Sequence, residues 1–155
     1  MKEGTQISSI NVKDLKNHDI NLIEKYKGQN LLIIIYNNQC LGCTGRGIPL
    51  AYELGKEFRH IQPIAIHTRF DHNESICAKA SFKPTTVNEI REIFTTGKEP
   101  FPIYLDEDNS VYKQFESKGT PQWLIINREG KLFRSFFGSM EGAQNRLGYS
   151  IMSLK

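Results

Sequence analysis

The sequence predicts an α/β fold of three layers, in which a central mixed sheet is flanked by helices. The run LLIIIY at residues 31–36 is continuously apolar and largely β-branched, which is typical of a strand buried on both faces of a sheet. After it, Leu50, Leu54 and Phe58 recur every four residues and form one apolar helical stripe. The run IQPIAIH at residues 61–67 is a second short apolar strand. Strand, helix and strand in this order predict a βαβ unit with a right-handed crossover.

Length and charge limit the possible classes of protein. A chain of 155 residues is predicted to form one domain, residues 1–155, whose core needs no disulfide or metal to be stable. The formal net charge is only +3, from 20 basic and 17 acidic residues. Because no basic block is present, charge gives no reason to expect nucleic acid or a membrane surface as a partner.

The N-terminal residues 1–19 contain neither an apolar segment nor the cleavage-site pattern of a signal peptide, which predicts a cytoplasmic protein. A signal or anchor removed from the chain would instead place the protein outside the cytoplasm. The longest apolar run, residues 31–36, is far too short to cross a bilayer. The reducing cytosol keeps structural disulfides rare, and three cysteines cannot form a framework of two disulfides.

Shorter elements are expected on both sides of the βαβ unit. Residues 7–12 are predicted to form a short edge strand, and residues 19–26 a short helix or turn region. Pro49 lies near the start of the central helix, either in its first turn or at a kink.

The second half of the chain is predicted to contain an inserted helix and strand, then a helix, a hairpin and a closing helix. Thr86 and Glu89 are spaced as a capping box for the inserted helix. The expected later elements are a strand at 101–105, a helix around 111–115, a hairpin whose turn at 127–130 ends in glycine, and a helix from 140 to 154. The insertion at 70–97 either shapes specificity or serves as scaffold.

Cys40 and Cys43 stand directly after the first buried strand and before the central helix. The unpaired N–H groups and the dipole of a helix start favour negative charge, so a thiol there ionises more readily to its reactive form. On a helical turn, the second sulfur of such a pair lies within bonding range of the first. Cys40, at the exposed strand-to-helix end, is predicted to attack an external disulfide, and the more shielded Cys43 to resolve the mixed disulfide.

Other interpretations of the pair have weaker support. Structural zinc needs four ligands, commonly from a second pair, and His67, His72 and Cys77 match no standard spacing, so no metal is expected. Two packing cysteines would be common in a core, but a pair flanked by Gln39 and glycines just outside a strand fits that role poorly. Cys77 is interpreted as a structural or incidental thiol. The four histidines show no catalytic spacing and are interpreted as surface or strand-end residues.

Three further side chains are interpreted as structural. Arg46 either favours the thiolate, holds a partner's carboxylate, or is a solvated residue of the helix face. The solvated interpretation is preferred, because exposed ion pairs contribute little. Tyr104 and Trp123 are expected in the core or on a sheet face rather than at a ligand.

The βαβ unit with CLGC at residues 40–43 resembles the thioredoxin fold. Residues 101–138 resemble the second half of the TlpA-like, redoxin-type thiol-disulfide oxidoreductases, and the similarity extends over roughly residues 7–154. Those proteins have an apolar strand ending in aspartate, a short helix, a Gly-Thr-Pro, a strand and a turn ending in glycine. Here these are 104–106, 111–115, 119–121, 123–126 and 127–130.

The resemblance implies a cis peptide bond before Pro121, in a loop beside the cysteine pair. In that family the neighbouring backbone pairs with a bound substrate strand, so Thr120 and Pro121 are the expected substrate-binding residues. This chain departs from the family in having Gln39 where tryptophan is frequent, and Leu41-Gly42 where proline is frequent. Residues between the cysteines help to set the redox potential, so the direction of electron flow stays open.

The position of the helix proline is a further departure. In many thioredoxins it comes five residues after the second cysteine, whereas Pro49 comes six after Cys43. The first turn of the helix is therefore expected to be irregular.

The resulting hypothesis is a thiol-disulfide oxidoreductase that uses Cys40 and Cys43 on protein or small-thiol disulfides and is recycled by an external thiol reductant or oxidant. No flavin or nicotinamide cofactor is expected, since no G-x-G-x-x-G follows a strand. One alternative is a peroxiredoxin-like peroxidase with Cys40 as its peroxidatic cysteine. The usual threonine or serine three residues earlier is Asn37 here, which counts against that alternative. The other alternative is a non-catalytic binding module of the same fold.

Overall fold

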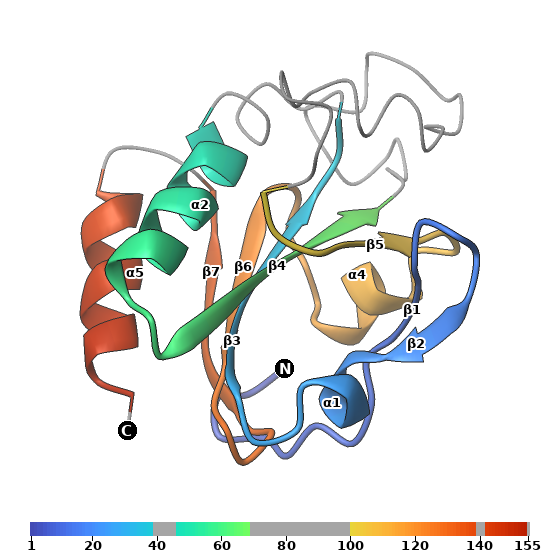
Figure 1. Cartoon of the computed structure of the whole chain (residues 1–155), viewed down its shortest axis with the longest axis horizontal. Coiled ribbons are helices and arrows are strands. Elements are labelled where there is room, and N and C mark those ends of the chain that lie inside the picture. Colours follow the sequence, from blue (N-terminus) through green and yellow to red (C-terminus); the bar gives the residue numbers. More distant parts are fainter. Residues whose placement is uncertain (39–45, 69–99, 139–141, 155) are drawn as a thin grey trace.

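The structure is a computed structural model, which describes residues 1–38, 46–68, 100–138 and 142–154. In these residues seven strands form one mixed sheet in the order β2-β1-β5-β4-β3-β6-β7 (Figure 1). The strands are β1 (Asn11–Lys13), β2 (Asp19–Asn21), β3 (Asn30–Tyr36), β4 (Ile61–Thr68), β5 (Ile103–Asp106), β6 (Gln122–Ile126) and β7 (Leu132–Phe137). The helices are α1 (Leu22–Lys25), α2 (Ile48–Glu57), α4 (Ser110–Gln114) and α5 (Ala143–Met152).

Strand β3 is the most deeply enclosed element of the sheet. All seven of its residues are buried, as its continuous apolar run predicts. It pairs in parallel with β4 from Asn30↔Ile61 to Tyr36↔His67, and antiparallel with β6 from Leu31↔Ile126 to Ile35↔Gln122. The predicted βαβ unit, formed by β3, α2 and β4, is therefore confirmed.

Helices cover both faces of the sheet and form the outer layers of the fold (Figure 1). Because side chains alternate along a strand, Leu32, Ile34 and Tyr36 of β3 pack in one cluster with α2 and α5. The intervening Leu31, Ile33 and Ile35 pack on the opposite face, in the cluster that contains residues of α1 and α4. The expected three-layer arrangement is confirmed.

The N-terminal region differs from the prediction. The strand expected at 7–12 is instead β1, Asn11–Lys13, and it is not at the edge, because β2 pairs with it on its outer side. The region 19–26, expected as a helix or turn, is divided between β2 and the single-turn helix α1. Asn21 ends the strand and starts the helix, since its side-chain oxygen accepts hydrogen bonds from the backbone N–H groups of Ile10 and Ile23.

The later elements agree closely with the prediction. The strand expected at 101–105 is β5, and the helix around 111–115 is α4. β6 and β7 form the expected antiparallel hairpin, and Gly130 ends its turn with a φ of +80°, which favours glycine. The closing helix is α5, whereas the expected helix at 86–94 lies outside the described residues.

Helix α2 begins irregularly, as its sequence predicts. Pro49 occupies the first turn rather than a kink, where its missing N–H costs no hydrogen bond. Residues 46–47 precede it in a π-helical turn, an uncommon conformation that is found mostly as single turns.

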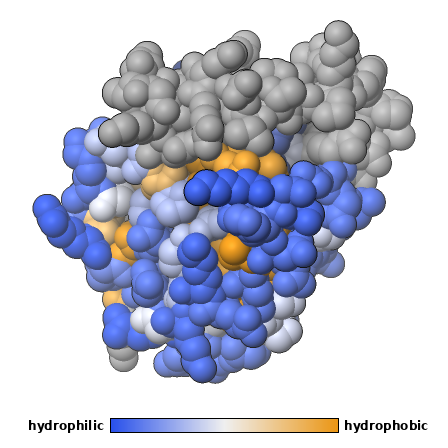
Figure 2. Space-filling model, turned by 45° about the vertical axis from the view of Figure 1, so that its right-hand side comes forward, coloured by the Kyte–Doolittle hydropathy of each residue, from blue (hydrophilic) through white to orange (hydrophobic). Residues whose placement is uncertain are grey.

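The face shown in Figure 2 is mainly hydrophilic, with small separate hydrophobic areas. Among the described residues, no helix combines the length and the apolar character needed to span a bilayer.

The central position of β3 predicts a large effect of cavity formation on stability. Ile34 is fully buried between the sheet and helices α2 and α5. We expect Ile34→Ala to lower the free energy of unfolding by about 2–5 kcal/mol, since it leaves a cavity in the core. Urea-induced unfolding measures this loss. Glu53→Ala, on the exposed side of α2, is the control and should change stability by less than about 0.5 kcal/mol; equal effects would contradict the assigned role of β3.

Candidate functional site

The predicted catalytic cysteines, Cys40 and Cys43, lie in residues 39–45, outside the described part of the chain, as does Cys77. The structure does describe the elements on either side of the pair. β3 ends at Tyr36, four residues before Cys40, and α2 begins at Ile48, five residues after Cys43. The pair therefore falls in a strand-to-helix connection, as the sequence predicts.

The predicted substrate-binding residues, Thr120 and Pro121, directly precede β6, which is the antiparallel neighbour of β3. The last register pair of these strands is Ile35↔Gln122. The next residue of β3, Tyr36, still pairs with His67 of β4, and Pro121 directly precedes Gln122. This pairing brings the chain that leads toward Cys40 and the Thr120-Pro121 loop to the same edge of the sheet.

The peptide bond between Thr120 and Pro121 is cis, which confirms the expectation from the resemblance. Both residues are buried. The Pro121 carbonyl accepts a 2.8 Å hydrogen bond from the Gly138 N–H, and the Trp123 indole N–H donates to the Gly138 carbonyl at 2.9 Å. The loop before β6 is thus joined to the end of β7, and Trp123, fully buried, has the structural role predicted for it.

Gly119 and Phe137 lie in close contact beside this loop. Gly119 has a φ of +148°, and a Cβ atom placed on it would lie 2.8 Å from Cε1 of Phe137. Phe137, the last residue of β7, is 49% exposed. An aromatic side chain is therefore presented to solvent next to the Thr120-Pro121 loop.

The chain leaving β3 is attached to the end of β4 by two side chains. The Asn37 amide Nδ2 donates to the Thr68 carbonyl at 2.8 Å, and the Asn38 backbone N–H donates to Nε2 of His67 at 3.2 Å. Asn37 and His67 are each 5% exposed. Burial lowers the pKa of the His67 imidazole from 6.5 to about 4, because a low-dielectric environment disfavours the cation.

The sequence interpretation of His67 as a strand-end residue is correct, but its contact with the chain leading to Cys40 was not predicted. The only sequence signal is a histidine at the end of an apolar strand. A contact with Asn38 becomes foreseeable once β3 and β4 are paired in parallel, because that register places Tyr36 beside His67.

The end of β5 has a structural role. Asp106 is 2% exposed and accepts hydrogen bonds from the backbone N–H groups of Val111 and Tyr112 at 3.0 and 2.9 Å. It also accepts one from the Thr68 hydroxyl at 2.9 Å. The aspartate that ends this strand therefore caps helix α4 and joins it to β4.

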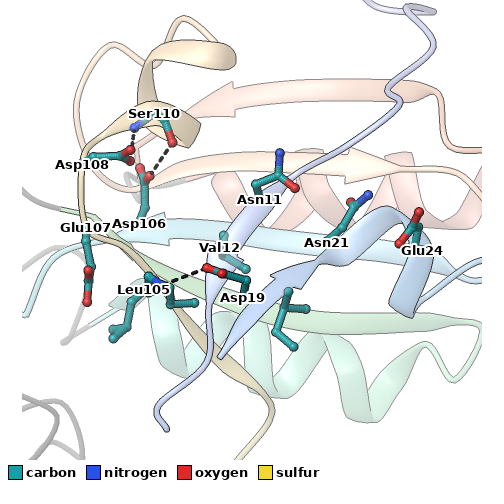
Figure 3. Close-up of a pocket in the computed structure, with 12 residues that line it drawn as sticks. Asn11, Val12, Asp19, Asn21, Glu24, Leu105, Asp106, Glu107, Asp108 and Ser110 are labelled. Carbon is teal, nitrogen blue, oxygen red and sulfur yellow. Dashed lines mark hydrogen bonds and ion pairs between the residues drawn. The ribbon is translucent and has the colours of Figure 1, made fainter. Parts of the chain in front are cut away.

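A polar cavity of about 550 Å³ lies between β1, β2 and the start of α4 (Figure 3). Three of the acidic side chains that line it have structural partners: Asp19 pairs with Lys13 at 2.8 Å, Asp108 accepts from the Ser110 N–H at 3.1 Å, and Asp106 caps α4. Glu24 and Glu107 also line the cavity.

The described ranges of the chain contain no group of three or more histidine, cysteine, aspartate or glutamate residues that could hold a metal ion. Arg46 is exposed, as the preferred interpretation of a solvated helix residue predicts. Tyr104 is 4% exposed on β5, with its hydroxyl 2.6 Å from that of Tyr26, and has the predicted structural role.

No protein-family model matches the sequence, and no curated protein matches it. The fold, however, is similar to several solved structures. A provisionally named thiol:disulfide interchange protein DsbE from Chlorobium tepidum has a TM-score of 0.77 and 14% identity, with coverage of 99% of this chain and 97% of that one. A thiol-disulfide isomerase from Corynebacterium glutamicum has a TM-score of 0.74 and 20% identity, with coverage of 97% and 96%.

A secreted disulfide oxidoreductase from Mycobacterium tuberculosis has a TM-score of 0.65 and 13% identity, with coverage of 94% of this chain and 96% of that one. At these identities the similarity concerns the fold. The chain has the thioredoxin-like fold that its sequence predicts, over nearly its whole length.

The conformation of Gly119 predicts that a side chain is poorly tolerated there. We expect Gly119→Ala to lower the free energy of unfolding by about 1–3 kcal/mol, because a φ of +148° disfavours L-residues and the methyl group would meet Phe137. Thermal and urea unfolding measure the change. The control is Gly148→Ala in the interior of α5, where the nearest atom is 4.0 Å from the added Cβ. It should preserve or raise stability. A Gly119→Ala protein as stable as the wild type would contradict the assigned strain.

The buried histidine predicts a specific dependence of stability on pH. The pKa of His67 is about 4 in the folded protein and 6.5 when unperturbed, so the unfolded chain binds the proton first as the pH falls. Stability is retained above pH 6.5 and is lost between 6.5 and 4, by about 3 kcal/mol in total.

His67→Gln, which does not titrate, is expected to lack this part of the acid dependence. Urea unfolding of both proteins over this pH range measures the difference, and other titrating groups cancel in it. Parallel stability curves for wild type and His67→Gln would contradict the prediction.

Proposed function

We propose that this protein is a thiol-disulfide oxidoreductase in which Cys40 is the attacking thiol and Cys43 the resolving thiol. The observation that carries the proposal is the arrangement around the end of β3. The strand is followed by the strand-to-helix connection that contains both cysteines, and its antiparallel neighbour β6 is directly preceded by the Thr120-Pro121 loop. Similarity of fold to solved thiol-disulfide oxidoreductases supports it.

The proposed reaction transfers two electrons from the protein to a disulfide. The Cys40 thiolate attacks one sulfur of the substrate, whose S–S bond breaks, and the departing thiolate takes up a proton. The mixed disulfide is then attacked by the Cys43 thiolate at the Cys40 sulfur. The second substrate thiol is released, and the Cys40–Cys43 disulfide remains. An external thiol reductant restores the dithiol; with an external oxidant the same steps run in reverse.

Thr120 and Pro121 are proposed to bind the substrate through the main chain of their loop. The proposal follows the resemblance, in which the backbone beside the cis proline pairs with a substrate strand; here that bond is cis and both residues are buried. Backbone pairing of this kind is independent of the substrate's side chains. The proposed partners are therefore protein or small-thiol disulfides, with no resident cofactor or metal.

The direction of the proposed reaction depends on the cellular compartment of the protein. The N-terminal sequence predicts the cytoplasm, whereas one structural neighbour is described as secreted. An oxidising compartment would favour formation of disulfides by the pair, and a reducing compartment would favour their reduction.

The test is reduction of insulin disulfides by the full chain in the presence of dithiothreitol, followed as precipitation of the insulin chains. We expect activity in the wild type and only the background rate in Cys40→Ser, because the attacking sulfur is lost. Cys43→Ser should lose turnover and accumulate a mixed disulfide at Cys40. Cys77→Ser is the matched control and should keep the wild-type rate.

Two results would contradict the proposal. Equal inactivity of wild type and Cys40→Ser toward disulfides, with one bound zinc ion per chain, would indicate a metal-binding or adaptor protein. Rapid consumption of peroxide that depends on Cys40, with little disulfide exchange, would indicate the peroxidase alternative.

A further inference from the structure

The chain that leaves β3 remains attached to β4 after the backbone pairing of these strands ends at Tyr36↔His67. Asn37 reaches the Thr68 carbonyl through its side-chain amide, at 2.8 Å. The Asn38 N–H reaches the ring of His67, at 3.2 Å. We call these four residues, Asn37, Asn38, His67 and Thr68, the strand-exit clamp. They extend the attachment of the two strands by two residues toward Cys40.

His67 is suited to this position by its protonation state and its packing. Since Nε2 accepts the hydrogen bond, the imidazole is neutral and carries its proton on Nδ1. The ring stands edge-on to Tyr36, with centroids 5.2 Å apart and an interplanar angle of 88°, and only 5% of the residue is exposed. Packing thus fixes the ring, and the fixed ring supplies an acceptor for the backbone of Asn38.

We propose that His67 is a positioning residue of the thiol-disulfide site, which sets how readily Cys40 ionises by fixing the backbone two residues before it. The proposal rests on the proposed function of Cys40. A thiolate is stabilised by nearby N–H groups and a helix start, and this stabilisation depends on where the chain places the sulfur. Releasing the Asn38 N–H from His67 removes one of the contacts that hold the chain before Cys40 and changes that placement.

Two substitutions separate the hydrogen bond from the packing of the ring. In His67→Gln, the amide Oε1 lies the same number of bonds from Cα as Nε2 and can accept from the Asn38 N–H. In His67→Phe, a planar ring still packs against Tyr36 but offers no acceptor. A role in positioning therefore predicts rescue by glutamine and loss with phenylalanine, whereas a role in packing alone predicts the opposite order.

The experiment uses the full chain with Cys43→Ser and Cys77→Ser, so that Cys40 is the single thiol among the three cysteines of the sequence. The rate of alkylation by iodoacetamide is measured over a pH series, which reports the thiolate fraction of Cys40. We expect His67→Phe to change the rate at neutral pH by roughly threefold or more, equivalent to about half a pKa unit. We expect His67→Gln to restore the parent profile. Identical profiles for all three proteins, or equal changes in both variants, would overturn the proposal.

A second measurement applies if His67→Phe does not fold. Nitrogen NMR of the wild-type histidine ring reports its tautomer, and we expect a neutral ring protonated on Nδ1. A proton on Nε2 would overturn the proposal, because that nitrogen could not then accept from Asn38. Failure of the proposed function is detected separately: the wild-type chain, with all three cysteines, would not reduce insulin, while the alkylation profile of Cys40 is measured without any turnover.

Discussion

The pairing of β3 with β4 on one side and with β6 on the other is the constraint on which the rest of the structure depends. It buries every residue of β3 and anchors both hydrophobic clusters, because alternate side chains of the strand enter opposite layers. The same register determines what lies at the strand's end. Tyr36 stands beside His67 in the parallel direction, and the antiparallel register continues toward Pro121. The core thus fixes the surroundings of the connection that carries Cys40 and Cys43.

At this edge of the sheet, side-chain hydrogen bonds join the ends of neighbouring strands. Asp106 is used in capping α4 and in binding Thr68, and Thr68 in turn accepts from Asn37 through its carbonyl. Three strand ends, of β3, β4 and β5, are therefore linked by side chains rather than by sheet pairing alone. Such a linked edge holds residues 37 and 38, which precede the cysteine pair, in one arrangement, and the proposed thiol chemistry needs such a rigid support.

Much of the fold was predictable because its central elements have strong local patterns. The β-branched run of β3, the helical stripe of α2 and the glycine-ended turn of the hairpin each identify their element without tertiary information. β1 and β2 were not predicted correctly because strands of three residues are too short to show a periodic pattern. β1 is stabilised by pairing with both β2 and β5, and β2 by pairing with β1. The cis bond at Pro121 followed only from family resemblance, and the Asn38–His67 contact joins residues that are 29 positions apart.

The account as a whole depends on Cys40 and Cys43 forming one reversible redox couple. The most direct measurement is a titration of the Cys77→Ser chain in glutathione buffers of graded redox potential, with the state of each cysteine determined by peptide mass analysis. The account predicts a single two-electron transition, in which a peptide linked through Cys40 and Cys43 appears as the two free thiols disappear. Thiols that stay reduced throughout, or that are modified independently of one another, would contradict it.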